Sequence, residues 1–186
     1  MKSVITLYID GLLDLFFVDE SGFSLSPNGF YGWQKIGEQL GIPSSTKNIQ
    51  NVLGFLSPID SNLITYTMPE KAYMNSELFI EYVEDFMSKR TRETALVVDR
   101  APWHTSWAVL DKIAEWENRG LHLIYLPPYS PHLNLIETLW RKIKNEWLKI
   151  KDYKSKTALK RKLKDIFSSF GKTYSIKFSM NIFKNI

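Results

Sequence analysis

The stretch from Leu126 to Trp140 reads LPPYSPHLNLIETLW, and it joins the end of an apolar run to the start of a helix. Its three prolines predict a rigid loop, because proline fixes its own φ angle and lacks a backbone N–H donor. The helical spacing of the apolar residues after Asn134 predicts a helix with these side chains buried. Glu137 lies at the third helical position, where its carboxylate would close a capping box with the amide of Asn134. Taken alone, this acid is explained by its place in the helix.

Two apolar runs upstream of this stretch each end in an aspartate. Leu15 to Val18 is followed by Asp19, and Ala95 to Val98 is followed by Asp99. Both runs predict buried strands, and α/β proteins place their sites at strand ends along one edge of a sheet. An aspartate after a strand is also common as a turn cap. Each acid by itself is therefore better explained as structural than as functional.

The remaining apolar pattern predicts a mixed sheet with helices packed on it. Ser21-Gly22 predicts a turn and Phe23 to Leu25 a second strand, and further strands are expected at residues 50–56, 63–68 and 121–126. Apolar residues at helical spacing predict helices at residues 75–90, around Trp107 before Gly120, from Asn134, and after Lys151. Trp107 and Trp140 are expected in the core, where aromatic residues at helical spacing usually lie.

The sequence contains no cysteine and three histidines, His104, His122 and His132. This excludes disulfides, thiol nucleophiles, iron–sulfur clusters and zinc sites built from cysteine. No two histidines have the spacing of a metalloprotease helix. Oxygen ligands therefore remain for any metal ion.

The net charge of +4 conceals an uneven distribution. Residues 1–99 contain 7 basic and 13 acidic residues, whereas residues 138–186 contain 14 basic and 3 acidic residues. This pattern indicates a polyanionic partner on one side and clustered carboxylates on the other. A solvated, lysine-rich surface explains the same pattern equally well. No membrane partner is expected, because no run approaches the roughly 18 apolar residues of a membrane span, and no signal peptide is recognisable.

Four blocks of the sequence, taken in order, resemble the blocks of a DDE transposase, most closely the bacterial insertion-sequence branch related to mariner elements. They are residues 18–25, Tyr31-Gly32-Trp33 with Gly37, residues 97–106, and the stretch 126–140. The last block is the most specific, and the resemblance covers about Leu15 to Lys151. It implies an α/β fold of the ribonuclease H-like type, with a mixed five-stranded sheet flanked by helices.

The resemblance also implies that Asp19, Asp99 and Glu137 form a catalytic, metal-binding triad. The expected cofactor is Mg²⁺ or Mn²⁺, in two ions about 3.5 to 4 Å apart that stabilise the attacking and leaving oxygens of a phosphodiester. Mg²⁺ prefers oxygen ligands and keeps some of its waters, so three carboxylates are sufficient. The expected function is DNA strand cleavage followed by 3′-hydroxyl strand transfer during transposition of an insertion sequence.

Several neighbouring residues are candidates for contact with DNA. His104 matches a histidine of the third block, where it either orients a phosphate or the attacking water, or simply hydrogen-bonds locally at a helix start. Arg100 stands where many relatives carry asparagine, and Leu135 stands where the family usually has proline. Arg100 is one candidate for a phosphate contact. The others are three cations of the helix that carries Glu137, namely Arg141, Lys142 and Lys144.

The resemblance suggests three parts: a leader or remnant at residues 1–13, the catalytic domain at residues 14–151, and a basic C-terminal helix and tail at residues 152–186. Relatives usually carry a helix-turn-helix region before the first acid, whereas only 18 residues precede Asp19. We therefore expect DNA as partner, a homodimer in the active complex, and a helix-turn-helix region supplied from an upstream reading frame. A cytoplasmic, nucleoid-associated bacterial protein follows from this interpretation.

Two alternatives stay open. The first is a nuclease of the same fold that hydrolyses DNA without joining it, against which the Pro-Tyr-Ser-Pro block argues. The second is a catalytically silent or truncated DNA-binding remnant of a transposase. The presence of all three acids favours competent chemistry, although a recently truncated copy would also retain them.

Overall fold

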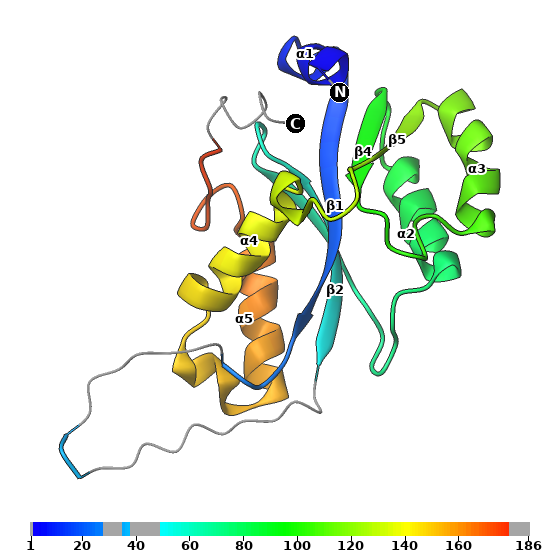
Figure 1. Cartoon of the computed structure of the whole chain (residues 1–186). Coiled ribbons are helices and arrows are strands. Elements are labelled where there is room, and N and C mark those ends of the chain that lie inside the picture. Colours follow the sequence, from blue (N-terminus) through cyan, green and yellow to red (C-terminus); the bar gives the residue numbers. More distant parts are fainter. Residues whose placement is uncertain (1, 28–34, 38–48, 179–186) are drawn as a thin grey trace.

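The computed structural model describes residues 2–27, 35–37 and 49–178. Within these ranges, five strands form one mixed sheet in the order β3-β2-β1-β4-β5 (Figure 1). The strands are β1 (Asp14–Phe23), β2 (Gln50–Ser57), β3 (Asn62–Thr67), β4 (Thr94–Val98) and β5 (Leu121–Tyr125). β1, β2 and β3 pair antiparallel, whereas β1, β4 and β5 run parallel. The predicted mixed five-stranded sheet is confirmed.

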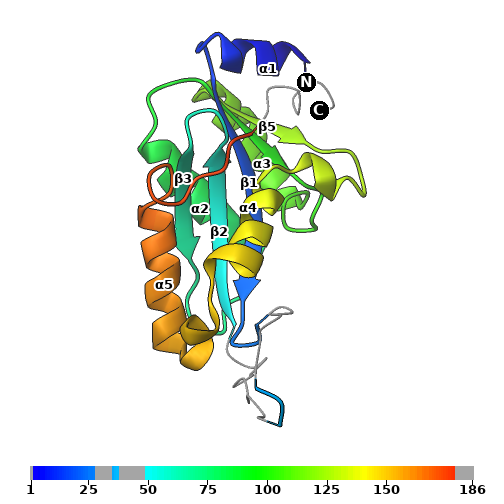
Figure 2. The same cartoon turned by 90° about the vertical axis from the view of Figure 1, so that its left-hand side faces the viewer.

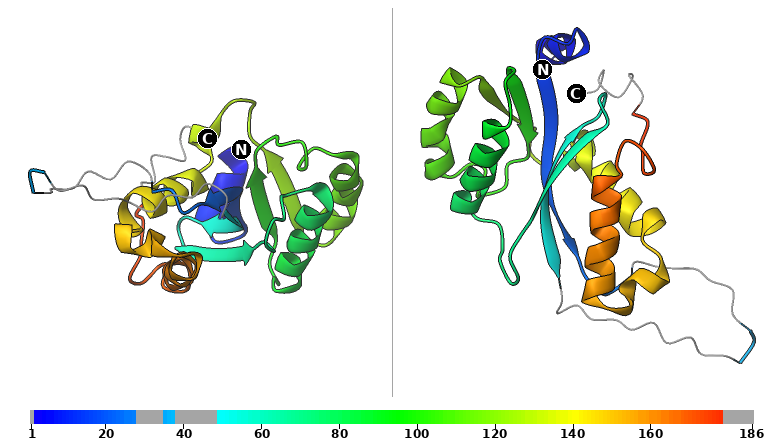
Figure 3. Two further views of the ribbon diagram at one scale, coloured as in Figure 1. Left: turned by 90° about the horizontal axis from the view of Figure 1, so that it is seen from below. Right: turned by 180° about the vertical axis from the view of Figure 1, so that it is seen from behind.

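Helices cover both faces of this sheet. α2 (Ser76–Ser88) and α3 (Trp107–Asn118) pack on one face, and α4 (Ile136–Lys142) and α5 (Lys156–Ser168) on the other (Figure 2, Figure 3). Short 3₁₀ turns lie at Pro131–Leu133 and Ile150–Lys154, and a π-helical segment, Ile143–Trp147, continues α4. α1 (Lys2–Ile9) precedes β1. None of the helices in the described ranges is long and apolar enough to cross a membrane.

β1 is the central strand and is covered on both of its faces. Leu15 and Phe17 belong to the core cluster of α4 and α5, whereas Phe16 and Val18 belong to that of α2 and α3. These four side chains are at most 1% exposed. A continuous apolar run is the pattern expected of a strand that lies between two layers of helices.

The turn predicted at Ser21-Gly22 is wrong, because β1 continues through both residues to Phe23. Ser21 pairs with Val52, and Gly22 pairs with Asn51. This pairing satisfies the backbone groups of the segment, and it overrides the local turn preference of serine and glycine. The sheet therefore extends several residues beyond the first acid.

The predicted helices are present, with one error in the assignment of the core. α2 begins as predicted, at an Asn75 cap. Trp140 is buried as predicted, but Trp107 is 82% exposed. Val109 lies on the buried face of α3, and Trp107, two residues earlier, is rotated by about 200° around the helix axis. Trp107 consequently faces solvent.

Both ends of the described chain contribute to the core. Ile5 and Tyr8 of α1 are buried, and the hydroxyl groups of Tyr8 and Ser57 lie 2.7 Å apart in a hydrogen bond. Leu159 and Leu163 of α5 join the same cluster as α4. The segments predicted as a leader and as a C-terminal extension therefore pack, where the structure describes them, against the central part of the chain.

Candidate active site

The three acids identified in the sequence line one cavity of about 420 Å³. Asp19 belongs to β1, Asp99 directly follows β4, and Glu137 lies in the first turn of α4. Arg100, Asn134 and the loop between β5 and α4 complete the lining. The fold thus brings together side chains from three well-separated parts of the chain.

The cavity lies where β1 and β4 diverge. Their parallel pairing ends at Phe17 and Val97, while β1 continues alongside β2. Asn134 bridges the divergence, because its side-chain amide donates to the carbonyl of Val18 at 3.0 Å. The first two acids therefore lie at a point where neighbouring strands separate, which is where α/β sheets commonly bind ligands.

The capping box expected at the start of α4 is not formed. The residue before the helix is Leu135, which has helical backbone angles, and no side chain caps the helix N-terminus. The backbone N–H of Asn134, which the box would use, donates to the carbonyl of Pro131 at 2.9 Å instead, and the side-chain amide of Asn134 donates to Val18 of β1. Glu137 is exposed, and it lines the cavity. The structural explanation of this acid is therefore wrong, and its carboxylate is available to a ligand.

The indole of Trp140, in α4, fixes the side chain of Asp19. The side chain of Asp19 is 9% exposed, and its Oδ2 accepts a hydrogen bond from Trp140 Nε1 at 3.1 Å. Gly54 is the cross-strand partner of Asp19, and a Cβ atom there would lie 2.7 Å from the Trp140 ring. A glycine is therefore required at this position for the indole to reach Asp19. Sequence reasoning missed this contact, although a glycine inside a strand is a known signal of close approach.

Negative charge is concentrated around Asp19. Burial, together with the charges of Glu137, Glu20 and Asp99, raises the pKa of the Asp19 carboxyl to about 8. Burial lowers the pKa of Lys144, while Glu137 and Asp19 oppose this effect. No lysine or arginine in the described chain forms an ion pair with any of the three cavity acids. An added cation would therefore relieve repulsion in this cavity.

Asp99 is oriented by two donors. Its Oδ1 accepts from the backbone N–H of Ala101 at 3.0 Å and lies 2.8 Å from His104 Nδ1. The hydrogen bond from His104 holds the pKa of Asp99 below its usual value, against the effect of partial burial. His104 is 0% exposed. Contact with a phosphate, one of the two alternatives for His104, does not fit such burial, whereas local hydrogen bonding does.

The basic candidates differ in their relation to the cavity. Arg100 lines it and donates from Nε to the carbonyl of Leu126 at 3.1 Å. Lys144 is partly buried, with its Nζ 5.3 Å from the centre of the Phe23 ring. Arg141 is exposed, and Lys142 forms an ion pair with Glu146 at 2.7 Å. The Tyr31-Gly32-Trp33 block lies outside the described residues.

The donor set of the cavity suits a divalent cation. Carboxylate oxygens are the ligands that Mg²⁺ and Mn²⁺ prefer. In the part of the chain that the structure describes, no group of three or more His, Cys, Asp and Glu side chains is arranged to hold a metal ion. Mg²⁺ is usually held by only one or two carboxylates, with water and substrate phosphate oxygens completing the shell. Pairs of the three acids are therefore sufficient, and a closed protein cage is not required.

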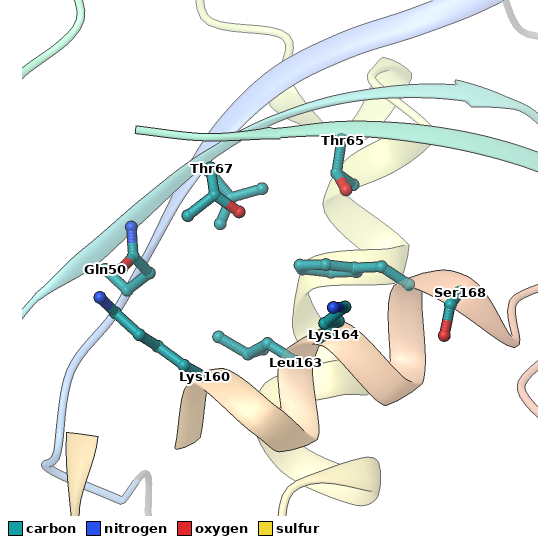
Figure 4. A pocket seen from close by; sticks show the side chains of 9 residues that line it. Gln50, Thr65, Thr67, Lys160, Leu163, Lys164 and Ser168 are labelled. Carbon is teal, nitrogen blue, oxygen red and sulfur yellow. The ribbon is translucent and has the colours of Figure 1, made fainter. Parts of the chain in front are cut away.

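A second cavity, of about 500 Å³, lies between β2, β3 and α5 (Figure 4). Val52, Leu163 and Phe167 supply its apolar lining, and Lys160 and Lys164 are its charged residues. No carboxylate lines this cavity and two lysines do, so it is a poor site for a hard cation. The smaller cavity is therefore the candidate active site.

Residues 14–160 match the family model of the DDE superfamily endonucleases. The chain belongs to this family. A segment of 61 residues is 38% identical to an uncharacterised protein of Sinorhizobium fredii, covering 31% of this chain and 41% of that protein. The family assignment agrees with the resemblance found in the sequence, and it makes this chain a DDE endonuclease domain.

Solved structures with the same fold include two of the Mos1 transposase. A Mos1 paired-end complex with the left transposon end has a TM-score of 0.63 at 15% identity, covering 90% of this chain and 52% of that chain. A mariner Mos1 paired-end complex with Mg also has a TM-score of 0.63, at 17% identity, covering 83% of this chain and 48% of that chain. The predicted ribonuclease H-like fold is thereby confirmed. The DDE endonuclease domain spans about half the length of these Mos1 chains.

Proposed function

We propose that this chain is the catalytic domain of a DNA transposase of an insertion sequence. It would cleave DNA strands and transfer the freed 3′-hydroxyl to a target with the help of divalent cations. The observation that carries the proposal is the convergence of Asp19, Asp99 and Glu137 on one cavity in a DDE endonuclease domain. A hydrolysing nuclease would need the same acids, so cleavage and joining require separate tests.

In this proposal, Asp19, Asp99 and Glu137 hold two Mg²⁺ or Mn²⁺ ions. The bound ions would stabilise the charge that develops on the attacking and leaving oxygens of the phosphodiester. One of the similar Mos1 complexes was solved with Mg and another with Mn. Trp140 fixes the orientation of Asp19, and the exposed Glu137 is free to adjust to a ligand.

The same proposal assigns DNA binding to cations near the cavity. Arg100 lies in the cavity lining, and Arg141, Lys142 and Lys144 follow Glu137 along α4 and its π-helical continuation. These side chains would contact phosphates, which fix position without reading sequence. Sequence recognition would come from a helix-turn-helix region encoded upstream, and two copies would assemble at the element ends. A protein with this role would work at the bacterial nucleoid.

Nicking of supercoiled plasmid in Mg²⁺ or Mn²⁺ tests the chemistry. We expect nicking by the wild-type chain, and its loss in Asp99→Asn and Glu137→Gln. Glu146→Gln is the matched control, because Glu146 is exposed in the same helical segment and, among the described residues, its side chain pairs only with Lys142. Circular dichroism checks that each variant is folded. An Asp99→Asn chain that nicks like the wild type would refute the assignment.

A second assay separates a transposase from a hydrolysing nuclease. A labelled duplex with a free 3′-hydroxyl is incubated with plasmid, and covalent joining of label to plasmid is measured. Joining supports the transposase. Nicking without joining supports the nuclease, and neither activity in either metal supports the silent remnant.

A further inference from the structure

Three side chains in successive contact, Asp99, His104 and Glu20, connect the second acid of the cavity to the central strand β1. Glu20 directly follows Asp19 in β1, and successive residues of a strand point to opposite faces of the sheet. Glu20 therefore points away from the side that carries Asp19. There its Oε1 lies 3.3 Å from His104 Nε2. His104 Nδ1 in turn lies 2.8 Å from Asp99 Oδ1.

His104 is enclosed between these two carboxylates. Its ring is 0% exposed, and its centre lies 4.4 Å from that of the Phe79 ring of α2. The contact with Glu20 is not aligned as a hydrogen bond, yet neither His104 Nε2 nor Glu20 Oε1 has a hydrogen-bond partner in the described chain. Leaving such buried atoms unpaired is unfavourable, because they have lost their hydrogen bonds to water. A small rotation that aligns the two atoms would remove this cost.

The backbone of His104 is fixed independently of its ring. Its N–H donates to the carbonyl of Ala101 at 2.9 Å, and its carbonyl accepts from the Tyr125 hydroxyl at 2.7 Å. The ring is therefore not needed to close the turn after β4. Instead, both ring nitrogens face carboxylates from separate elements.

The consequence for Asp99 is that its two oxygens have different roles. Oδ1 is occupied by His104 Nδ1 and by the backbone N–H of Ala101. The Asp99 side chain is 48% exposed and lines the cavity, and Oδ2 has no protein hydrogen bond in the described chain. A carboxylate held in this way presents one defined oxygen.

We propose that His104 and Glu20 are positioning residues for the divalent-cation site: His104 fixes one oxygen of Asp99 so that the other faces the cation, and Glu20 fixes the ring of His104. This inference rests on the proposed function, because it takes Asp99 as a ligand. Partners that orient a metal ligand typically change metal affinity by 10- to 100-fold. We expect about a tenfold effect, because Ala101 retains one of the two bonds to Oδ1.

Mn²⁺ binding to the free chain, measured by electron paramagnetic resonance without DNA, tests the inference. In His104→Asn the amide nitrogen takes the place of Nδ1 and keeps the donor to Asp99. In His104→Gln the amide nitrogen takes the place of Nε2, so Asp99 loses its donor. We expect Mn²⁺ affinity within about threefold of wild type for His104→Asn and about tenfold weaker for His104→Gln.

Substitutions of Glu20 test the second contact, which is the one between Glu20 and His104. Glu20→Gln keeps an acceptor oxygen for His104 Nε2, whereas Glu20→Leu removes it. We expect weaker Mn²⁺ binding in Glu20→Leu than in Glu20→Gln. Thermal unfolding in EDTA confirms that each variant is folded, and the Glu20 pair alone decides the question if His104→Gln does not fold.

Asp99→Asn separates failure of this inference from failure of the proposed function. Weak Mn²⁺ binding by Asp99→Asn with wild-type binding by His104→Gln and Glu20→Leu would refute the positioning role alone. Wild-type binding by Asp99→Asn would instead refute Asp99 as a ligand, and with it the metal site on which the inference rests. A rescue by His104→Asn is the result that a purely structural role of the ring would not produce.

Discussion

Replacement of Asp19 by asparagine is expected to stabilise the metal-free protein while it removes metal binding. The carboxylate is 9% exposed and has three acidic neighbours, so its ionised form is unfavourable in the folded chain. Asparagine has nearly the same shape, and its side-chain oxygen can still accept the hydrogen bond from Trp140 Nε1. The substitution therefore removes charge without removing packing.

The magnitude follows from the pKa of Asp19. Burial, with the charges of Glu137, Glu20 and Asp99, raises this pKa from 3.8 to about 8. Between these values the Asp19 carboxyl binds more protons in the folded chain than in the unfolded chain, so its contribution to stability is greatest below pH 3.8 and falls as the pH rises toward 8. At about 1.4 kcal/mol per pH unit, the upper limit is about 6 kcal/mol. Local relaxation and water entry reduce this, and we expect about 2 to 4 kcal/mol at pH 8.

Thermal unfolding in EDTA at pH 5 and pH 8 measures this effect. About 2 to 4 kcal/mol corresponds to a rise in Tm of roughly 4 to 16 °C for a chain of this size. The gain should be smaller at pH 5, where the wild-type carboxyl is protonated in the folded state. The reasoning would be refuted if the Asp19→Asn protein were less stable than wild type at pH 8. It would also be refuted if the gain in Tm over wild type were the same at pH 5 and pH 8.

Three further predictions follow from the same geometry. Mn²⁺ at a hundred times its dissociation constant should raise the free energy of unfolding of the wild type by about 2.7 kcal/mol, measured as a rise in Tm. An equal rise in Tm in Asp19→Asn would contradict the assignment of Asp19 as a ligand. Gly54→Ala should destabilise the fold by about 1 to 3 kcal/mol in urea unfolding, because its Cβ would collide with the Trp140 ring; an unchanged midpoint would show that the contact is not tight. The logarithm of DNA affinity should fall by about 0.9 per contacted phosphate for each tenfold rise in salt, and a flat salt series would leave only a solubilising role for the basic residues of α4 and α5.

The sequence was sufficient to predict the elements whose apolar pattern is continuous or periodic. β4 and α2 fall where these patterns predict them, because each is defined by local spacing. The turn at Ser21-Gly22 was wrong because its conformation is decided by pairing with a strand about thirty residues away. Trp107 was misassigned because helical spacing does not reveal which face of a helix meets the sheet.

The candidate site was predictable only in part, because some of its contacts depend on the tertiary structure and not on local spacing. Asp19 and Asp99 end apolar runs, and the resemblance grouped them with Glu137. The contacts of His104 with Glu20 and Asp99 could not be predicted from a local sequence pattern, since they depend on which strand faces which loop after folding. Gly54 did carry a signal, a glycine within a strand pattern, but its partner Trp140 could not be identified without the tertiary structure.

The contact between Trp140 and Asp19 joins residues 121 positions apart in the chain. The cavity beside it needs β1, β4 and the start of α4 together, and β2, β3 and α2 lie between the first two in sequence. Contacts of such long sequence separation require the loops between them to close, which costs conformational entropy. A nascent or proteolysed chain that ends before α4 therefore contains two of the acids but no cavity. The candidate site is therefore complete only once α4 has been synthesised and has packed on the sheet.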